Sequence, residues 1–330
     1  MITPKFHFYE GATCPDLSMA EGLASPYSMA PSSENPDGRV VLMEHTGSVI
    51  AHAALWWKET PMIGGVKIGA IGGFAARDAK AAKTLLDGAS DHLRDLGFRV
   101  AVGPMNGNTW RRYRFVIESD GHSPFLLEPR NPAGYPDWWR QAGFEELSRY
   151  SSSIIREINT PTVLPCLRDR LIRSRIVIRE LDSSRYDDEL RTIYRISLRS
   201  FSGNFLYTPL DETSFLDAYR KVRDKVDPDF VRIAERDGVP CGFVFALRDL
   251  EAEARGEIPA LVVKTLAVDP ASRCAGLGSL LIDEIHRLGR QKGYTEMIHA
   301  LQHETNTSLR ITGRHHGQVF RRYALFSKSL

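Results

Sequence analysis

One feature constrains the fold of this chain more than any other: the same order of elements occurs twice. Each occurrence runs through a hairpin, a further apolar strand, an amphipathic helix that ends at a glycine followed by an aromatic residue, and another strand. The glycine–aromatic pairs are Gly97–Phe98 and Gly293–Tyr294. Glycine just beyond the last helical residue is typical of a helix C-terminus. The pattern therefore predicts two copies of one α/β unit.

The individual elements follow from hydrophobic periodicity. Residues 79–96 and about 278–292 place apolar side chains three and four positions apart, which predicts amphipathic helices. Further helices are predicted over 187–201, after Asp211 and within 135–144. Short apolar or alternating runs predict strands at 39–45, 48–57, 66–74, 99–103, 175–182, 230–247, 260–268, 295–301 and 319–326.

The chain divides into four segments on this basis. Residues 1–38 are rich in Pro, Ser and Gly without a sustained period, which predicts an irregular lead-in. The first unit covers 39–156 and the second covers 175–330. Residues 157–174 contain two prolines and few periodic apolar positions, so we interpret them as the linker between the units.

Composition narrows the class of protein. The 330 residues suit about two domains, and 43 basic against 41 acidic side chains leave a net charge of only +2. This balance disfavours nucleic acid or a membrane surface as a partner held by bulk charge. No apolar run is long enough to span a bilayer and no export signal is recognisable, so a cytoplasmic protein is expected. The scattered cysteines, which predict neither a disulfide framework nor a metal site, are Cys14, Cys166, Cys241 and Cys274.

The segment DPASRCAGLGS, residues 269–279, lies between a predicted strand and a predicted helix. A glycine-containing turn at a helix N-terminus presents unpaired backbone N–H groups where the helix dipole also favours an anion. Gly276 and Gly278 permit close approach, and Arg273 adds a positive charge. The motif lacks both the GK[ST] of a P-loop and the third glycine of GxGxxG. It predicts a phosphate site of another kind, the alternative being a turn that binds nothing.

The spacing Arg-x-x-Gly-x-Gly, after LAVDP and before an amphipathic helix, resembles the pyrophosphate-binding loop of the GNAT superfamily of N-acetyltransferases. The resemblance implies acetyl-CoA as cosubstrate, no metal, and in each unit a mixed, mostly antiparallel twisted sheet flanked by helices. The first unit reads FAARDAK at 74–80, where the loop would stand, and has no glycine pair. We therefore interpret the chain as two tandem GNAT-like units, of which the first is degenerate, with one acetyl-CoA site.

The same resemblance assigns the cofactor-binding residues. It implies that backbone groups of one strand pair with the pantetheine arm, that an asparagine lies beside this arm, and that the loop holds the pyrophosphate. A thiol within such a loop presents its backbone amide and is not a nucleophile. The residues concerned are Leu266, Ala267 and Val268 on the strand, Asn306 beside the arm, and Arg273, Cys274, Ala275, Gly276, Leu277, Gly278 and Ser279 in the loop.

The general acid is left unassigned by the sequence. Many relatives use a tyrosine for this role, but the family spacing counted from Asn306 leads to Thr312. The candidates nearby are His303, Glu304 and Tyr323, since an imidazole, a carboxyl or a phenol can carry a proton. Their alternative roles are a solvated loop histidine, a helix-capping acid and a strand-packing tyrosine.

Candidates for the acceptor pocket come from both units. The family places this pocket opposite the cofactor, partly on the loop between the first two helices, here residues 202–209. In the first unit, the segment after the strand at 99–103 mixes polar, aromatic and cationic groups suited to a polar or anionic ligand. Aromatic cover for the core and a solvated hairpin are the alternatives. The candidates are Asn204, Phe205, Tyr207, Asn106, Trp110 and Arg112.

The function predicted from these features is an N-acetyltransferase that moves acetyl from acetyl-CoA to a primary amine, a small molecule, by direct attack in a ternary complex. A non-catalytic acetyl-CoA sensor or interaction protein is an alternative, because the family tyrosine is missing. Aminoacyl transfer from aminoacyl-tRNA on a similar tandem fold is a second alternative, disfavoured by the neutral charge balance. A monomer or weak homodimer is expected.

Overall fold

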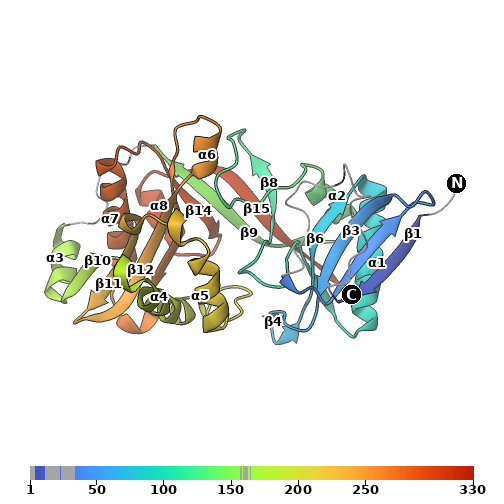
Figure 1. The fold of residues 1–330 in the computed structure, drawn as a ribbon, viewed down its shortest axis with the longest axis horizontal. Helices are drawn as coiled ribbons and strands as arrows, with labels where there is room; N and C mark the ends of the chain where they lie inside the picture. The colour runs from blue at the N-terminus through green and yellow to red at the C-terminus, as the bar shows by residue number, and fades with distance from the viewer. Residues whose placement is uncertain (1–3, 12–22, 24–33, 157, 159–162, 164) are drawn as a thin grey trace.

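The computed structural model describes residues 4–11, 23, 34–156, 158, 163 and 165–330, and it places the two units side by side along one continuous sheet (Figure 1). The sheet is mixed and mostly antiparallel, with helices against its faces, as predicted. Within the described residues, no helix combines the length and the apolar character that crossing a membrane requires.

The first unit is a five-stranded part of this sheet in the order β1-β2-β3-β6-β7, with helix α1 packed against it. Only β6 and β7 run parallel, since α1 connects them. The elements are β1 (Lys5–Glu10), β2 (Gly38–Met43), β3 (Val49–Trp56), the small hairpin β4 (Met62–Ile63) and β5 (Val66–Lys67), β6 (Gly69–Ala76), α1 (Ala79–Asp95), β7 (Val100–Gly103), β8 (Phe115–Ser119), α2 (Tyr135–Gln141) and β9 (Glu145–Ile155).

The second unit follows the same plan in the order β14-β13-β12-β11-β10. Helix α7 connects the parallel strands β13 and β14 and packs on one face of the sheet, while α4 covers the other. The elements are α3 (Pro165–Arg173), β10 (Ile176–Glu180), α4 (Tyr186–Phe201), α5 (Glu212–Arg220), β11 (Val231–Arg236), β12 (Val239–Arg248), α6 (Leu250–Ala254), β13 (Leu261–Val268), α7 (Leu277–Gln291), β14 (Met297–His303), α8 (Ser308–Arg314) and β15 (Gln318–Ser329), with short 3₁₀ turns at Ser183–Arg185, Arg223–Lys225, Pro228–Phe230 and Pro270–Ser272.

The two units share strands at their junction. Strand β9, the last of the first unit, pairs with β14 of the second. Strand β15, the last of the second unit, pairs with β9 along most of its length and with β7 through residues 326–329. Each unit therefore completes its part of the sheet with a strand that belongs, by sequence, to the other.

The helices begin and end where local chemistry dictates. The Asp78 side chain accepts a hydrogen bond from the Ala81 backbone N–H at 2.8 Å and so caps the first turn of α1. The helix ends just before Gly97, which has a φ of +88°, a conformation that glycine adopts without strain. Leu85, Leu86 and the other buried side chains of α1 fall on one face, as the periodicity predicts.

Two segments differ from the prediction. The lead-in was expected to be irregular, but residues 5–10 form β1, which pairs antiparallel with β2. Of the other residues in the lead-in, 1–3, 12–22 and 24–33 lie outside the described part. This edge strand exposes most of its side chains, but Phe6 and Phe8 alternate along it, and the Phe8 ring stacks on that of His92 in α1 with the centroids 4.0 Å apart. The expected linker contains helix α3, in which Leu171 is buried. Residues 157, 159–162 and 164 of this segment lie outside the described part of the chain. The bounds of the two units stay a prediction.

Candidate functional site

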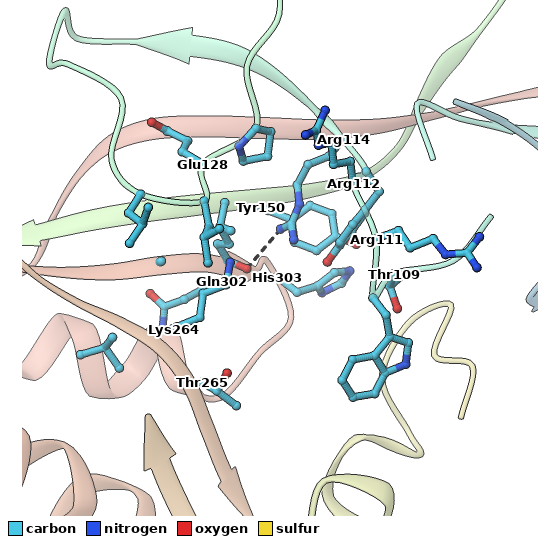
Figure 2. A pocket seen from close by; sticks show the side chains of 18 of the residues that line it. Thr109, Arg111, Arg112, Arg114, Glu128, Tyr150, Lys264, Thr265, Gln302 and His303 are labelled. Atoms are coloured by element: carbon cyan, nitrogen blue, oxygen red, sulfur yellow. Dashed lines mark hydrogen bonds between the residues drawn. The ribbon is translucent and has the colours of Figure 1, made fainter. Parts of the chain in front are cut away.

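A cavity of about 1390 Å³ lies where the two units meet (Figure 2). The first unit contributes the residues from Asn106 to Phe115 and from Leu126 to Pro132. The second contributes strand residues Val263–Leu266 and the end of β14. Loops of both units close it, which is why neither unit forms this cavity alone.

Strands β13 and β14 separate at the floor of this cavity. They pair in parallel only between residues 261–263 and 297–299. Beyond that point Lys264 is an extra residue opposite β12, because Phe245 pairs with Thr265 and Ala246 with Val263. Such a bulge increases twist and redirects a side chain. The divergence leaves the β14-facing edge of the end of β13 without a strand partner within the described residues, so an extended ligand can lie along it.

The loop that precedes α7 holds several unpaired backbone amides. Arg273 and Gly276 both adopt positive φ, +49° and +92°. Within the described part of the chain, no acceptor receives the backbone N–H of Cys274, Ala275, Gly276, Gly278 or Ser279. A helix N-terminus favours negative charge, so the loop has the unpaired backbone groups that the predicted phosphate site requires, and the site itself stays a prediction.

Side chains from two neighbouring helices support this loop. Arg170 of α3 donates to the Ala275 carbonyl at 3.1 Å, and Arg314 of α8 donates to Ser279 Oγ at 3.2 Å. A Cβ placed on Gly276 would lie 2.7 Å from the Leu167 side chain, which is close enough to force a shift. Glycine is therefore required there by both φ and space.

The remaining predicted cofactor residues lie between the loop and the cavity. Leu266 and Asn306 line the cavity, whereas Ala267 is buried and Val268 leads into the loop. The Asn306 side chain accepts from the Ser308 backbone N–H at 3.0 Å at the start of α8. No group of three or more His, Cys, Asp or Glu side chains suited to a metal occurs among the described residues.

Of the three candidate proton carriers, His303 lies on the cavity wall. Its Nε2 is 2.8 Å from Ser148 Oγ and its Nδ1 is 2.8 Å from Thr305 Oγ1. Burial lowers the pKa of His303, so the ring is neutral at pH 7. Glu304 follows at the end of the strand and is not among the residues that line the cavity.

Tyr323 is fully buried and does not line the cavity. Its hydroxyl hydrogen-bonds the Glu128 carboxylate and lies 3.0 Å from Ser152 Oγ, and Glu128 also pairs with Arg321 at 3.0 Å. Burial and the carboxylate raise the pKa of Tyr323 well above its usual value. The alternation of β15 places this ring in the core, which favours the strand-packing alternative.

All six candidate acceptor residues line the cavity, three from each unit. The Trp110 indole N–H donates to the Thr208 carbonyl of the other unit at 2.7 Å, and its ring centroid lies 6.1 Å from that of Tyr207. The two loops that the sequence singled out independently are thus in contact. The six residues are Asn106, Trp110, Arg112, Asn204, Phe205 and Tyr207.

Of the charged groups on the cavity wall, Arg114 belongs to the cationic segment noted after the strand at 99–103, whereas sequence reasoning missed Glu128 and Lys264 (Figure 2). Burial and the nearby Arg114 charge lower the pKa of Lys264 to about 8. A lysine within the apolar run ALVVKTLAV was a signal that could have identified it. Glu128 and Tyr150 gave no such signal, because only the folded chain brings their loop and strand to the cavity.

Residues 190–311, which include the diverging strands and the amide-rich loop, match the profile of the acetyltransferase (GNAT) family. The chain as a whole has a tandem GNAT fold. It superposes on a tandem GNAT protein from the clavulanic acid biosynthesis pathway with a TM-score of 0.51, 11% identity and 98% of each chain covered.

Two curated proteins are similar in sequence. One is the bacterial ceramide synthase of Caulobacter vibrioides, 27% identical over 197 residues, which are 58% of this chain and 51% of that protein. The other is protein YghO of Escherichia coli, 22% identical over 178 residues, 53% of this chain and 45% of that protein. The chain spans about half the length of these relatives.

Proposed function

We propose that this protein is a CoA-thioester-dependent N-acyltransferase, which transfers acetyl from acetyl-CoA to a primary amine by direct attack in a ternary complex. The observation that carries the proposal is the set of unpaired amides from Cys274 to Ser279, connected by diverging strands to a cavity. The match of residues 190–311 to the GNAT family profile supports it.

The residues present fit the donor. The loop amides and the α7 dipole hold a diphosphate, and Arg273 adds charge. The free edge of Leu266–Val268 takes the pantetheine arm by main-chain pairing. Since Leu266 and Asn306 line the cavity, an arm held there delivers its thioester to the same space that the acceptor enters. The thioester supplies an activated acyl carbon.

The cavity wall supplies a proton carrier for the transfer. Attack forms the C–N bond and breaks the C–S bond, and the proton released from nitrogen ends on the thiol sulfur. His303, neutral and held by two hydroxyls, is the group that carries this proton.

A longer acyl chain or a long-chain acceptor is a second candidate. The cavity of about 1390 Å³ exceeds the roughly 300–1,000 Å³ of common small-molecule sites, and aromatic and aliphatic side chains such as Phe115, Phe245 and Leu247 line much of it. The name of the Caulobacter relative, ceramide synthase, denotes formation of an amide on a long-chain amine. The apolar part of the cavity wall favours an acyl or acceptor chain of this kind.

A thiol-release screen tests the proposal. Acetyl-, octanoyl- and palmitoyl-CoA are each incubated with pools of polyamines, amino acids, aminoglycosides, peptides and long-chain amines, and free CoA is measured. Release with acetyl-CoA supports the first candidate, and release only with longer donors supports the second. Binding of a CoA thioester without release from any pool contradicts an enzyme and favours the sensor. Release with aminoacyl-tRNA alone favours the remaining alternative.

A further inference from the structure

Within the residues that the structure describes, Arg114 is a buried cation without an anionic partner. Its side chain is 8% exposed and lines the cavity. The guanidinium carbon lies 3.9 Å and 4.2 Å from the ring centroids of Tyr113 and Tyr150, and one terminal nitrogen donates to the Leu301 carbonyl at 3.3 Å. Its Nε has no hydrogen-bond partner in the described part of the chain. The two rings hold the charge in place, and several N–H donors stay free.

Lys264 is a second cation of the same cavity. It stands at the bulge of β13, where the strand separates from β14, and it is near enough to Arg114 for the two charges to repel. No hydrogen bond or ion pair holds its ammonium group among the described residues. Figure 2 shows both side chains on the wall of the cavity.

The carboxylates that share the cavity are engaged by other groups. Glu128 pairs with Arg321, Glu251 pairs with Arg130, and Glu34 accepts from the Asn106 amide at 2.7 Å. None of them neutralises Arg114 or Lys264. Two partly or fully buried cations that share one cavity without a counter-charge are unfavourable, so a protein that keeps them there gains when a ligand supplies the anion.

We propose that the acceptor carries, besides its amine, an anionic oxygen group, a carboxylate or a phosphate monoester, which Arg114 and Lys264 bind in this cavity. Calling the ligand the acceptor rests on the proposed function. The fork of N–H donors on Arg114 matches two oxygens of either group, and Lys264 adds a point charge.

The donor diphosphate does not account for these cations. Its predicted loop, residues 273–279, contributes no side chain to the cavity wall. The two anion sites are therefore separate, one at the N-terminus of α7 and one between the units. An amine without an acid group meets only repulsion from Arg114 and Lys264, whereas an acid group on the same molecule offsets it. This difference selects acid-bearing amines.

The test uses three matched amines: 2-aminooctanoate, 2-aminooctyl phosphate and 2-aminooctan-1-ol, which differ only in the group beside the amine. Binding to the full chain is measured by calorimetry without any CoA thioester, and acyl transfer is measured separately with the best donor. The variants are Lys264→Gln and Arg114→Gln. Lys225→Gln is the control, because this exposed lysine lines the same cavity.

We expect at least one of the two acids to bind about tenfold or more tightly than the alcohol, since hydrogen bonds to charged groups are stronger than those between neutral groups. Lys264→Gln and Arg114→Gln should each remove most of that preference, because the acids lose a contact and the alcohol loses a repulsion, and Lys225→Gln should keep it. Which acid binds distinguishes carboxylate from phosphate.

Equal binding of all three amines, or no binding of any, overturns the inference. So does a loss of kcat that is the same for acid and alcohol acceptors in Lys264→Gln, because that pattern places the cation at the reacting carbonyl. Selective binding without acyl transfer leaves the anion site intact and removes the proposed function, so the two failures are distinguishable.

Discussion

The Nε2 atoms of His286 and His299 lie 3.1 Å apart in the interior of the second unit, where α7 packs against β14. His299 Nδ1 is also 2.8 Å from Thr312 Oγ1. Burial, reinforced by the neighbouring histidines, lowers the pKa of His286 to about 3 and that of His299 well below its usual value. Both rings are therefore neutral in the folded protein at pH 7.

The stability of the fold should decrease in mild acid. A histidine whose folded pKa lies below its unfolded value of about 6.5 lowers the free energy of unfolding by up to about 1.4 kcal/mol per pH unit as the pH falls below 6.5. This loss continues toward pH 3 for His286, and His52, with a pKa of about 4 caused by burial, adds to it. Urea unfolding at pH 7.5, 6.5 and 5.5 measures the slope.

The variant His286→Leu should reduce that slope between pH 6.5 and 5.5, whatever its effect on stability at pH 7.5. Replacement of the exposed His45 by Leu should leave the slope as it is. A slope that His286→Leu does not change would mean that this ring does not stay neutral when folded.

Gly276→Asp should abolish tight CoA binding. The substitution places a carboxylate at the helix N-terminus where a diphosphate is expected, and its Cβ meets Leu167. Gly293 at the other end of α7 has a similar φ, +85°, and open space around it, so Gly293→Asp carries similar backbone strain away from the site. Calorimetry with CoA should show about a tenfold or greater loss for Gly276→Asp alone. Equal losses would point to unfolding.

Tyr323→Phe should lower stability by about 1 kcal/mol through the lost hydrogen bond to Glu128, with kcat unchanged.

His303→Gln should lower kcat by about 10²-fold or more, because it removes the proton carrier on the cavity wall. Thermal melts and steady-state kinetics on both variants separate the two roles. A large drop in kcat for Tyr323→Phe at full folding would instead make the tyrosine catalytic.

Trp110→Ala should weaken the contact between the units. The indole donates to Thr208 and its ring lies 6.0 Å from Phe215, centroid to centroid, so truncation removes a hydrogen bond and aromatic packing. We expect a loss of roughly 2–3 kcal/mol and a higher KM for the acceptor, whereas Trp110→Phe keeps the packing and loses about 1 kcal/mol. Unchanged melting and KM in Trp110→Ala would show that this contact contributes little.

The parts of the fold set by local chemistry could be predicted from the sequence. Three such parts are helix α1 with Gly97 after it, the N-cap at Asp211 and the loop before α7. Each depends on residues that are neighbours in the sequence, so the sequence pattern predicted it. Strand β1 was missed although Phe6 and Phe8 alternate, because the run is short and its partner β2 begins only at Gly38, beyond a segment rich in Pro, Ser and Gly.

In the candidate site too, the residues set by local composition could be predicted and those brought together by the fold could not. The six acceptor candidates come from two loops with unusual local composition, and all of them reach the cavity. Arg114 and Lys264 could not be paired from the sequence, because 150 positions separate them and strand divergence together with a bulge brings them into one cavity. Contacts between distant segments depend on topology, which periodicity does not encode.

The exchange of β9 and β15 has a consequence for biosynthesis. Strand β7 pairs with β6 on one side, but on its other side the neighbour comes only at residues 326–329, so the first unit of a nascent chain has an open edge until these residues have left the ribosome. Open edges of this kind invite aggregation and slow folding. Cutting the gene between the halves should therefore give two fragments that need each other to become soluble, and recombination could not shuffle either half as a self-sufficient module.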